Sequence, residues 1–442
     1  MQRRTFLASA AATGVAAALS PSVSMAQATN PLLQKWTGPY GGVPAFDKVK
    51  VEQFKPALEA AMAKNLAEID AITASKAAPT FENTIAALED AGRGLNDVQT
   101  YYYIWGSNMS TPEFQKVEEE MDPKLSAHYD KINQNAALFA RIEAVYTSPD
   151  KAKLTPEQQR VLWIYYTNFV RSGAKLSPAA KARVGAINTE LAGLYTKFSQ
   201  NLLADENTWI ELSPADLAGL PEGLKAAAAS NAESRKLPGK FIVVNTRSSV
   251  DPFLTESPVR AREKVWRAFV NRGDNGGATD NNAIISKILK LRAERAKLLG
   301  YKTHAHWRLE NAMAKNPENA MALMEAVWTP AIAQVAIDVA DMQAIIDKEA
   351  SQSKEGGFKL EPWDYRYYAE KVRKAKYDLD MNEVKPYLQL DKLREGMFWA
   401  SGQLYGFEFK KLSGIPVYHE DITVYEVTRG GKHVGLWYFD PY

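Results

Sequence analysis

Hydrophobic residues recur at helical spacing along most of the chain. Phe54, Leu58, Met62 and Leu66 follow one another at intervals of four residues, which is typical of the apolar face of an amphipathic helix. The pattern restarts after Thr80, a residue suited to cap a helix, and extends to Gly92. The same reasoning predicts further helices at about 112–145, 155–171, 177–204, 258–272, 281–299, 317–350, 362–374 and 391–405.

Strand patterns are confined to two parts of the chain. Residues 240–246 (KFIVVNT) form a short run rich in β-branched residues. Near the end, two alternating runs flank residues 429–432 (RGGK), a good hairpin turn, so Tyr425–Val427 is expected to pair with Val434–Tyr438. No repeat with a fixed period is visible. The sequence therefore predicts a mainly α, large multi-helix protein with a small β-ribbon at its C-terminal end.

The first 26 residues have the composition of an export signal. Arg3 and Arg4 precede an uncharged apolar run over 6–19, and a small-x-small site ends at Ala26. The paired arginines and the alanine-rich core indicate a twin-arginine signal, with an ordinary secretory signal as the alternative. Residues 1–26 are thus interpreted as a signal peptide, and the mature protein as periplasmic. No later segment is judged apolar enough to span a membrane.

Charge and cysteine content exclude several classes of function. The formal net charge is +2, and both excess charges are Arg3 and Arg4, so the chain after the signal is neutral. A neutral chain argues against a nucleic-acid or anionic-membrane surface as its main partner. Because the chain contains no cysteine, it has neither disulfides nor a thiolate metal site.

The histidines offer no complete set of metal ligands. They are His128, His304, His306, His419 and His433, and no H-E-x-x-H motif occurs in the 442 residues. His304 and His306 are interpreted as a partly exposed pair at a helix start. His419 and His433 are placed on the two arms of the hairpin. They could bind a metal as a cross-strand pair or simply pack in the sheet, and packing is favoured. No catalytic, cofactor-binding or metal-binding residue is nominated.

Two other segments are interpreted as structural. Residues 272–282 (RGDNGGATDNN) lack the acidic spacing of a calcium loop and are predicted to connect helices and to cap the helix that contains Ile284. The aromatic cluster Tyr101, Tyr102, Tyr103 and Trp105 is expected on a helix, in the core and at a cleft wall. Phosphate-binding glycine motifs and the G-x-S-x-G elbow are not found in the sequence.

Seven segments in order resemble one family. They are GVPAFDKVKVEQFKPALEAAM, PTFENTIAALEDAG, FVRSGAKLSP, LYTKFSQNLL, RAFVNRGDNGGATDNNAIISKILKLRAERAKLLGYKTHAHWRLENAMAKNP, PWDYRYYAEKVRKAKYDLD and LYGFEFKKL. Together, over about residues 30–442, they resemble the thimet-oligopeptidase family of zinc metallopeptidases, in the branch of peptidyl-dipeptidases and oligopeptidase A. The export signal favours the dipeptidyl carboxypeptidase subgroup.

The resemblance implies a zincin-type oligopeptidase architecture. Residues 27–250 would form an N-terminal helical domain with an extended arm, and 251–442 the first part of the catalytic domain. In the family, zinc is held by an H-E-x-x-H helix and a later Glu, and these positions lie beyond the residues matched here. The resemblance therefore implies a truncated chain that is inactive as written and holds no zinc itself.

In the complete enzyme the resemblance implies zinc-assisted hydrolysis of short unfolded peptides by a monomer. A peptide backbone is expected to pair with the strand near 421–427, taken as a sheet edge. Neither nucleic acid nor, after removal of the signal, a membrane is expected as a partner. The alternative is a non-catalytic exported helical protein that binds peptides or acts as a scaffold. An unrelated helical periplasmic enzyme is a third possibility, for which no site is visible.

Overall fold

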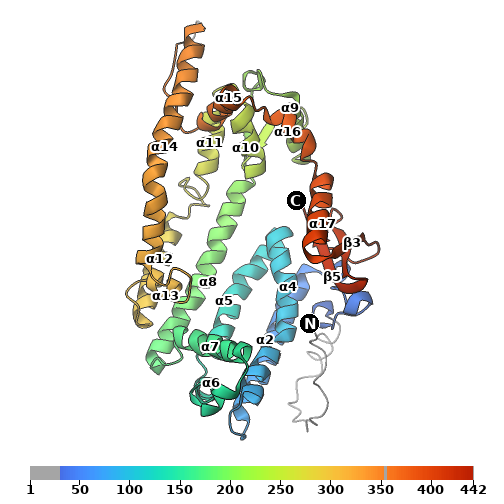
Figure 1. The fold of residues 1–442 in the computed structure, drawn as a ribbon, viewed down its shortest axis with the longest axis vertical. Coiled ribbons are helices and arrows are strands. Elements are labelled where there is room, and N and C mark those ends of the chain that lie inside the picture. Colours follow the sequence, from blue (N-terminus) through green and yellow to red (C-terminus); the bar gives the residue numbers. More distant parts are fainter. Residues whose placement is uncertain (1–29, 353–355, 442) are drawn as a thin grey trace.

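The computed structural model describes residues 30–352 and 356–441 and is dominated by helices (Figure 1). The predicted leader, 1–26, lies outside the described residues. The α-helices are α2 (Phe54–Ala74), α3 (Ala87–Asp90), α4 (Arg93–Asn108), α5 (Pro112–Asn133), α6 (Ala136–Thr147), α7 (Pro156–Arg171), α8 (Pro178–Glu206), α9 (Glu222–Ser234), α10 (Arg247–Glu256), α11 (Arg262–Val270), α12 (Asn282–Leu298), α13 (His304–Leu309), α14 (Pro317–Gln352), α15 (Tyr365–Tyr377), α16 (Met381–Val384) and α17 (Leu390–Tyr405). The mainly α prediction is confirmed.

Short 3₁₀-helices and one π-helical segment, η5, lie among these elements in the described chain. They are η1 (Pro31–Leu33), η2 (Pro39–Gly41), η3 (Phe46–Lys48), η4 (Val51–Gln53), η5 (Phe81–Ala86), η6 (Pro149–Lys153), η7 (Pro214–Leu217) and η8 (Lys385–Tyr387). The first three form the arm before α2. The predicted helix over 112–145 is in fact two helices, because Asn135 leaves the helical path and its side chain accepts a hydrogen bond from the Leu138 backbone N–H, which caps α6.

Side-chain caps start most helices of the first half. Thr80, Thr111, Thr155 and Ser177 each accept a hydrogen bond from the backbone N–H three residues later. In the last three cases proline occupies the first helical position, where its missing N–H has no helical partner to lose. The restart of the pattern at Thr80 was therefore predicted correctly, although the first turns of that segment are wide.

The core of the first half is formed by stripes from adjacent helices. Phe54 and Leu58 of α2 are fully buried against Tyr102 and Trp105 of α4 and Phe114 of α5. A second cluster joins the far end of α2 to α6 and α7, and α5 also packs along α8. These helices lie side by side in Figure 1. The apolar faces of these helices therefore pack against one another, and the burial of their side chains stabilises the folded first half.

A buried ion pair joins α11 to the segment before α15. The Arg262 guanidinium lies 2.6 Å from the Asp364 carboxylate, and both side chains are 1% exposed or less. Arg262 also donates to the Ser257 carbonyl at 2.6 Å and lies over the Tyr367 ring. Since both charges are removed from water, each depends on the other for compensation.

The C-terminal sheet has three antiparallel strands in the order β3 (Phe407–Lys411), β4 (Thr423–Arg429), β5 (Lys432–Phe439). The predicted pairing is confirmed: Tyr425 lies opposite Trp437, and Val427 opposite Gly435. Gly430 and Gly431 form the turn with φ of 55° and 70°, which glycine adopts without strain. A separate two-stranded ribbon pairs β1 (Trp209–Glu211) with β2 (Ile242–Val244).

The strand β3 corrects one prediction. Residues 421–427 are not a sheet edge, because β3 pairs with β4 on the side away from β5. Phe407–Lys411 was overlooked because Glu408 and two lysines dilute its alternation. Within the described residues, β5 and β3 are the edges of this sheet.

Helix α14 also corrects a prediction. By length and composition it is able to span a membrane, and none of its apolar window is buried in the structure. The statement that no segment after the leader is apolar enough is therefore wrong. Glu325 and Pro330 lie within this otherwise apolar part of the helix. In Figure 1 α14 runs along one side of the molecule, away from the sheet.

Candidate functional site

The structure separates the histidines. His128 is buried in α5, where its Nε2 lies 2.8 Å from the Asn65 amide oxygen, as expected of a core residue. His304 and His306 begin α13 and are partly exposed, as predicted. Burial, followed by the charges of Arg292, Arg295 and Arg308, lowers the pKa of His304 to about 4.

The C-terminal pair is not a cross-strand pair. His433 lies opposite Thr428 in the sheet. Its Nδ1 lies 3.1 Å from the Glu426 carboxylate, and its ring lies 5.2 Å from the Tyr40 ring at an angle of 32°. His419 lies in the loop before β4, beside Asp421. The two-arm placement was wrong because the first strand begins only at Thr423. Across residues 30–352 and 356–441, no group of three or more His, Asp or Glu side chains is arranged to hold a metal ion.

A large hollow lies between the N-terminal arm, α4 and β5. Its volume is about 1000 Å³, and it is lined by apolar and aromatic side chains with few polar groups, among them Trp36, Tyr40, Phe46, Ile104, Leu436 and Tyr438. The arm is held by the Tyr101 hydroxyl, which accepts from the Ala45 N–H at 2.9 Å. Gly42 is needed here, since a Cβ at this position would lie 2.5 Å from the Trp36 carbonyl oxygen.

A polar network includes Tyr418, one of the residues that line this hollow. The Tyr418 hydroxyl donates to the Asp440 carboxylate at 2.7 Å, and the Asn108 amide donates to both at 3.0 Å. Burial and the Asp440 carboxylate raise the pKa of Tyr418 to about 12, so the phenol stays protonated at neutral pH. The network fixes the end of β5 to α4.

Two features make this hollow the best candidate for binding an extended peptide. Its aromatic lining suits apolar side chains, and the outer edge of β5 carries backbone groups that no other described strand pairs with. The one histidine among its lining residues, His433, pairs with Glu426, and the Tyr418 hydroxyl pairs with Asp440. The arrangement is therefore suited to binding.

A second hollow, of about 370 Å³, contains an acidic pair between α5 and α8. Asp122 accepts from the Tyr102 hydroxyl at 2.7 Å and from the Thr196 hydroxyl at 2.5 Å. Burial, followed by the charge of Asp122, raises the pKa of Glu118 to about 7. The sequence signal for this pair was present, since the two residues are four apart on a predicted helix, but it was not used.

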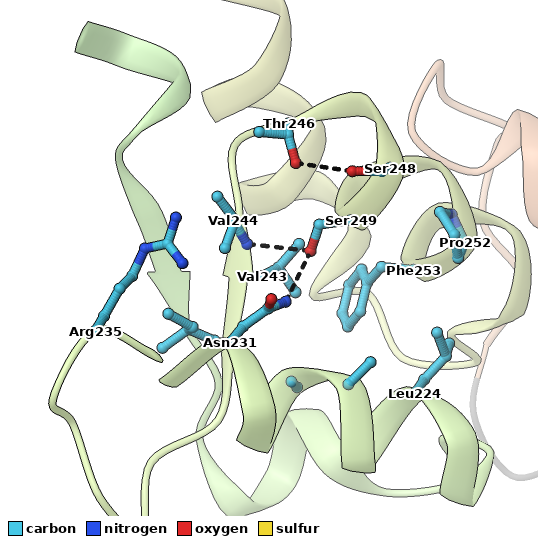
Figure 2. Close-up of a pocket in the computed structure, with 13 residues that line it drawn as sticks. Leu224, Asn231, Arg235, Val243, Val244, Thr246, Ser248, Ser249, Pro252 and Phe253 are labelled. Atoms are coloured by element: carbon cyan, nitrogen blue, oxygen red, sulfur yellow. Dashed lines mark hydrogen bonds between the residues drawn. The ribbon is translucent and has the colours of Figure 1, made fainter. Parts of the chain in front are cut away.

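Figure 2 shows a third hollow, also of about 370 Å³, between α9, β2 and the start of α10. The Ser249 hydroxyl accepts from the Val244 N–H at 3.2 Å and from the Asn231 amide at 3.4 Å. Arg235 stands at its rim. Since none of the residues that line it is His, Asp or Glu, no base is present to activate its hydroxyls.

The carboxylate of Asp205 holds several groups of the glycine-rich loop at 272–282. Asp205, at the end of α8, accepts from the Gly273 N–H at 2.7 Å, the Asn275 amide at 2.8 Å and the Thr279 hydroxyl at 2.6 Å. The loop leads directly into α12. This confirms its interpretation as a helix connection, and Asp205 was the residue that sequence reasoning missed.

The aromatic cluster on α4 is divided between core and surface. Tyr101, Tyr102 and Trp105 are buried, whereas Tyr103 is 58% exposed. The prediction of a helical aromatic group in the core is confirmed for the three buried members. Tyr103 receives a hydrogen bond from Gln99 and lies away from the large hollow's lining.

Comparison with known proteins gives a consistent relationship. Residues 253–442 match the sequence model of peptidase family M3. The chain is 36% identical over 416 residues to dipeptidyl carboxypeptidase of Escherichia coli, covering 93% of this chain and 60% of that protein. It is 28% identical over 422 residues to oligopeptidase A of Escherichia coli (94% and 60%) and 29% identical over 433 residues to the organellar oligopeptidase A of Arabidopsis thaliana (94% and 52%). The chain thus spans 60% or less of the length of these relatives.

Proposed function

The chain belongs to the thimet-oligopeptidase family, peptidase family M3, in the branch of dipeptidyl carboxypeptidase and oligopeptidase A. From that premise we propose that it supplies the peptide-binding wall of a zinc peptidase that acts on short peptides. The observation that carries the proposal is the 36% identity to dipeptidyl carboxypeptidase across 93% of the chain. The large hollow beside β5 supports it, because an extended peptide would find both an unpaired strand edge and an aromatic surface there.

The residues described here do not fit a zinc site. The family is one of zinc peptidases, but the histidines are dispersed and no metal-binding cluster occurs within the described ranges. No catalytic step is therefore assigned to a residue of this chain. We propose that the 442 residues alone neither retain zinc nor hydrolyse peptides.

This proposal is tested with the purified chain after dialysis against zinc-containing buffer. We expect much less than one zinc per chain and no chelator-sensitive hydrolysis of blocked tetrapeptides. A zinc content of one per chain together with hydrolysis would overturn it.

Peptide binding is measured separately with a fluorescently labelled, blocked tetrapeptide that has apolar side chains. We expect saturable binding that Leu436→Asp weakens at least fivefold, because the substitution places a charge in the hollow. The matched control is Leu289→Asp on α12, which is 59% exposed and outside the hollow. If binding is strong and no catalytic partner exists in the cell, the non-catalytic peptide-binding alternative is favoured.

We also propose export by the twin-arginine route, supported by Arg3, Arg4 and the alanine-rich apolar run that follows them. Changing both arginines to lysine should leave the precursor in the cytoplasm, as followed by cell fractionation. Continued export of this variant would indicate the ordinary secretory route.

A further inference from the structure

The outer edge of β2 forms one side of the hollow shown in Figure 2. The Asn245 N–H donates to the Thr208 carbonyl at 2.9 Å, so Asn245, and Val243 two residues earlier, direct their backbone groups towards β1. The alternation of an antiparallel pair then directs the N–H and C=O groups of Ile242 and Val244 away from β1. Since every residue of β2 lines the hollow, this edge faces into it.

Helices α9 and α10 bring hydrogen-bond donors to the same edge. The Ser249 hydroxyl accepts from the Val244 N–H at 3.2 Å and from the Asn231 amide at 3.4 Å (Figure 2). Both bonds use the oxygen as acceptor, so the hydroxyl proton remains available to a ligand. The Ile242 N–H also has no acceptor within the described residues. The hollow therefore presents unused donors beside an open strand edge.

A single positive charge stands at the margin of the hollow. The Arg235 guanidinium donates to the Ser234 hydroxyl at 3.3 Å, and its carbon lies 6.0 Å from the centre of the Trp209 ring. No carboxylate of the described residues pairs with it, and none of the residues that line the hollow is acidic. The hollow is therefore electrostatically suited to an anionic group.

Most of the remaining wall is apolar. Leu224 of α9, Val243 of β2 and Phe253 of α10 contribute to it. The volume of about 370 Å³ lies in the range of small-ligand sites, about 300–1000 Å³. One cation beside an apolar wall favours a carboxylate on an apolar body over a phosphate group, which carries more charge and no apolar surface.

We propose that this hollow binds the C-terminal residue of a short peptide whose last side chain is apolar. Arg235 attracts the terminal carboxylate, and the Ser249 hydroxyl donates to it. The last amide of the peptide pairs with the edge of β2 at Ile242, and the side chain packs on Phe253. All of these groups lie within residues 231–253, so the site is separate from the hollow beside β5 and independent of the function proposed above.

The test titrates the purified chain with N-acetyl-Ala-Phe and follows binding by calorimetry. We expect saturable binding, and about tenfold weaker binding of the C-terminal amide of the same dipeptide, because the charge-assisted bonds are lost. Arg235→Gln should cause a similar loss. The matched control is Arg247→Gln. Arg247 pairs with Asp251 and does not line the hollow, so this variant should bind within about twofold of the unchanged chain.

A second pair of variants tests the hollow itself. Ala227 lines it from an exposed position on α9, so Ala227→Trp should fill the space without disturbing the core and should abolish binding. Ala226 is also exposed but does not line the hollow, so Ala226→Trp should bind as the unchanged chain does. Bound dipeptide should slow amide exchange over residues 241–249, and circular dichroism checks that each variant is folded.

Several outcomes would overturn the proposal. They are no binding, equal affinity for acid and amide, equal losses in the two arginine variants, or binding that survives Ala227→Trp. The acid 4-phenylbutyrate has the carboxylate and the ring but no amide. If it binds as tightly as the dipeptide, the assignment to a peptide is wrong and the ligand is a free apolar acid. Leu436→Asp in the hollow beside β5 should leave dipeptide binding unchanged, so the two proposals fail separately.

Discussion

The two parts of the molecule before and after Tyr301 bury their apolar residues to very different extents. Before Tyr301, long buried runs on α2, α4, α5 and α6 form shared clusters. After it, the buried apolar residues are Met342, Ile346, Trp363, Tyr368, Ile422, Val424 and Tyr425, whereas Leu323, Trp328, Trp399 and Leu404 are each more than 60% exposed. Helices of similar pattern thus occur in both parts. The apolar stripe of a helix specifies which face can be buried, but it does not specify which other element packs on that face.

A buried ion pair between the two parts should show the largest effect. Arg262→Ala leaves the Asp364 carboxylate buried without its counter-charge, and we expect it to lower the free energy of unfolding by about 3–5 kcal/mol. Urea unfolding followed by circular dichroism measures the loss, and amide exchange should rise first in α15. Arg260 is the matched control. It lies 3.9 Å from the same carboxylate but is 50% exposed, so Arg260→Ala should change the free energy by less than about 1 kcal/mol. Equal effects would mean that Asp364 is reached by water.

The same leucine truncation in each part tests the comparison directly. Leu162 on α7 is fully buried, and Leu162→Ala should lower the free energy of unfolding by about 2–5 kcal/mol through lost burial and a cavity. Leu393 on α17 is 50% exposed, and Leu393→Ala should change it by no more than about 0.5 kcal/mol. If both truncations are equally destabilising in urea melts, then α17 is covered in solution.

A pH-dependent effect of intermediate size is expected within the first part. The unfolded chain releases the Glu118 proton near its ordinary pKa of 4.5, and the folded chain releases it near 7. Between these values the folded state binds more protons, so the free energy of unfolding falls as pH rises from about 4.5 to about 7. Glu118→Gln should remove this slope and stabilise the protein by about 1–2 kcal/mol above pH 7. Glu119→Gln, at an exposed position of α5, should leave the slope in place.

Helix caps give the smallest expected difference. Thr155→Ala removes the reciprocal cap of α7 and should destabilise by about 1 kcal/mol. At α17, Gln389 makes no side-chain cap bond. Gln389→Ser should supply a cap and stabilise α17 by a few tenths of a kcal/mol, up to about 1 kcal/mol. Amide exchange at the first turns of α7 and α17 measures both changes, and slower exchange after Thr155→Ala would contradict the first.

The sequence predicted the positions of helices and strands better than it predicted which of them pack or pair together. Helix starts such as Thr155 and Ser177 could be located because a cap and a following proline act locally. The pairing of β4 with β5 followed from one glycine turn. In contrast, β3 and the central place of β4 depend on contacts more than ten residues away in sequence, which alternation alone does not encode.

The candidate site was less predictable for the same reason. The large hollow combines the arm around Tyr40 with β5, so it exists only when residues some four hundred positions apart are brought together. The Asp205 node is similar, because nothing near Asp205 in sequence indicates that it will receive bonds from Gly273 and Thr279. Family resemblance supplied the class of peptidase, which residue spacing did not.

The loop around Asp205 also bears on how the protein ages. Asn275-Gly276 is the dipeptide most prone to deamidation, in which the glycine nitrogen attacks the asparagine amide carbon to form a succinimide. Here both reacting groups are held: Asn275 donates to Asp205 at 2.8 Å and accepts from the Gly277 N–H at 2.9 Å, while the Gly276 N–H donates to Asp280 at 2.9 Å. Conversion to aspartate would moreover set a carboxylate against Asp205. The loop therefore restrains both groups that deamidation of Asn275 requires, and we expect deamidation at this position to be slower in the folded chain than in the unfolded chain.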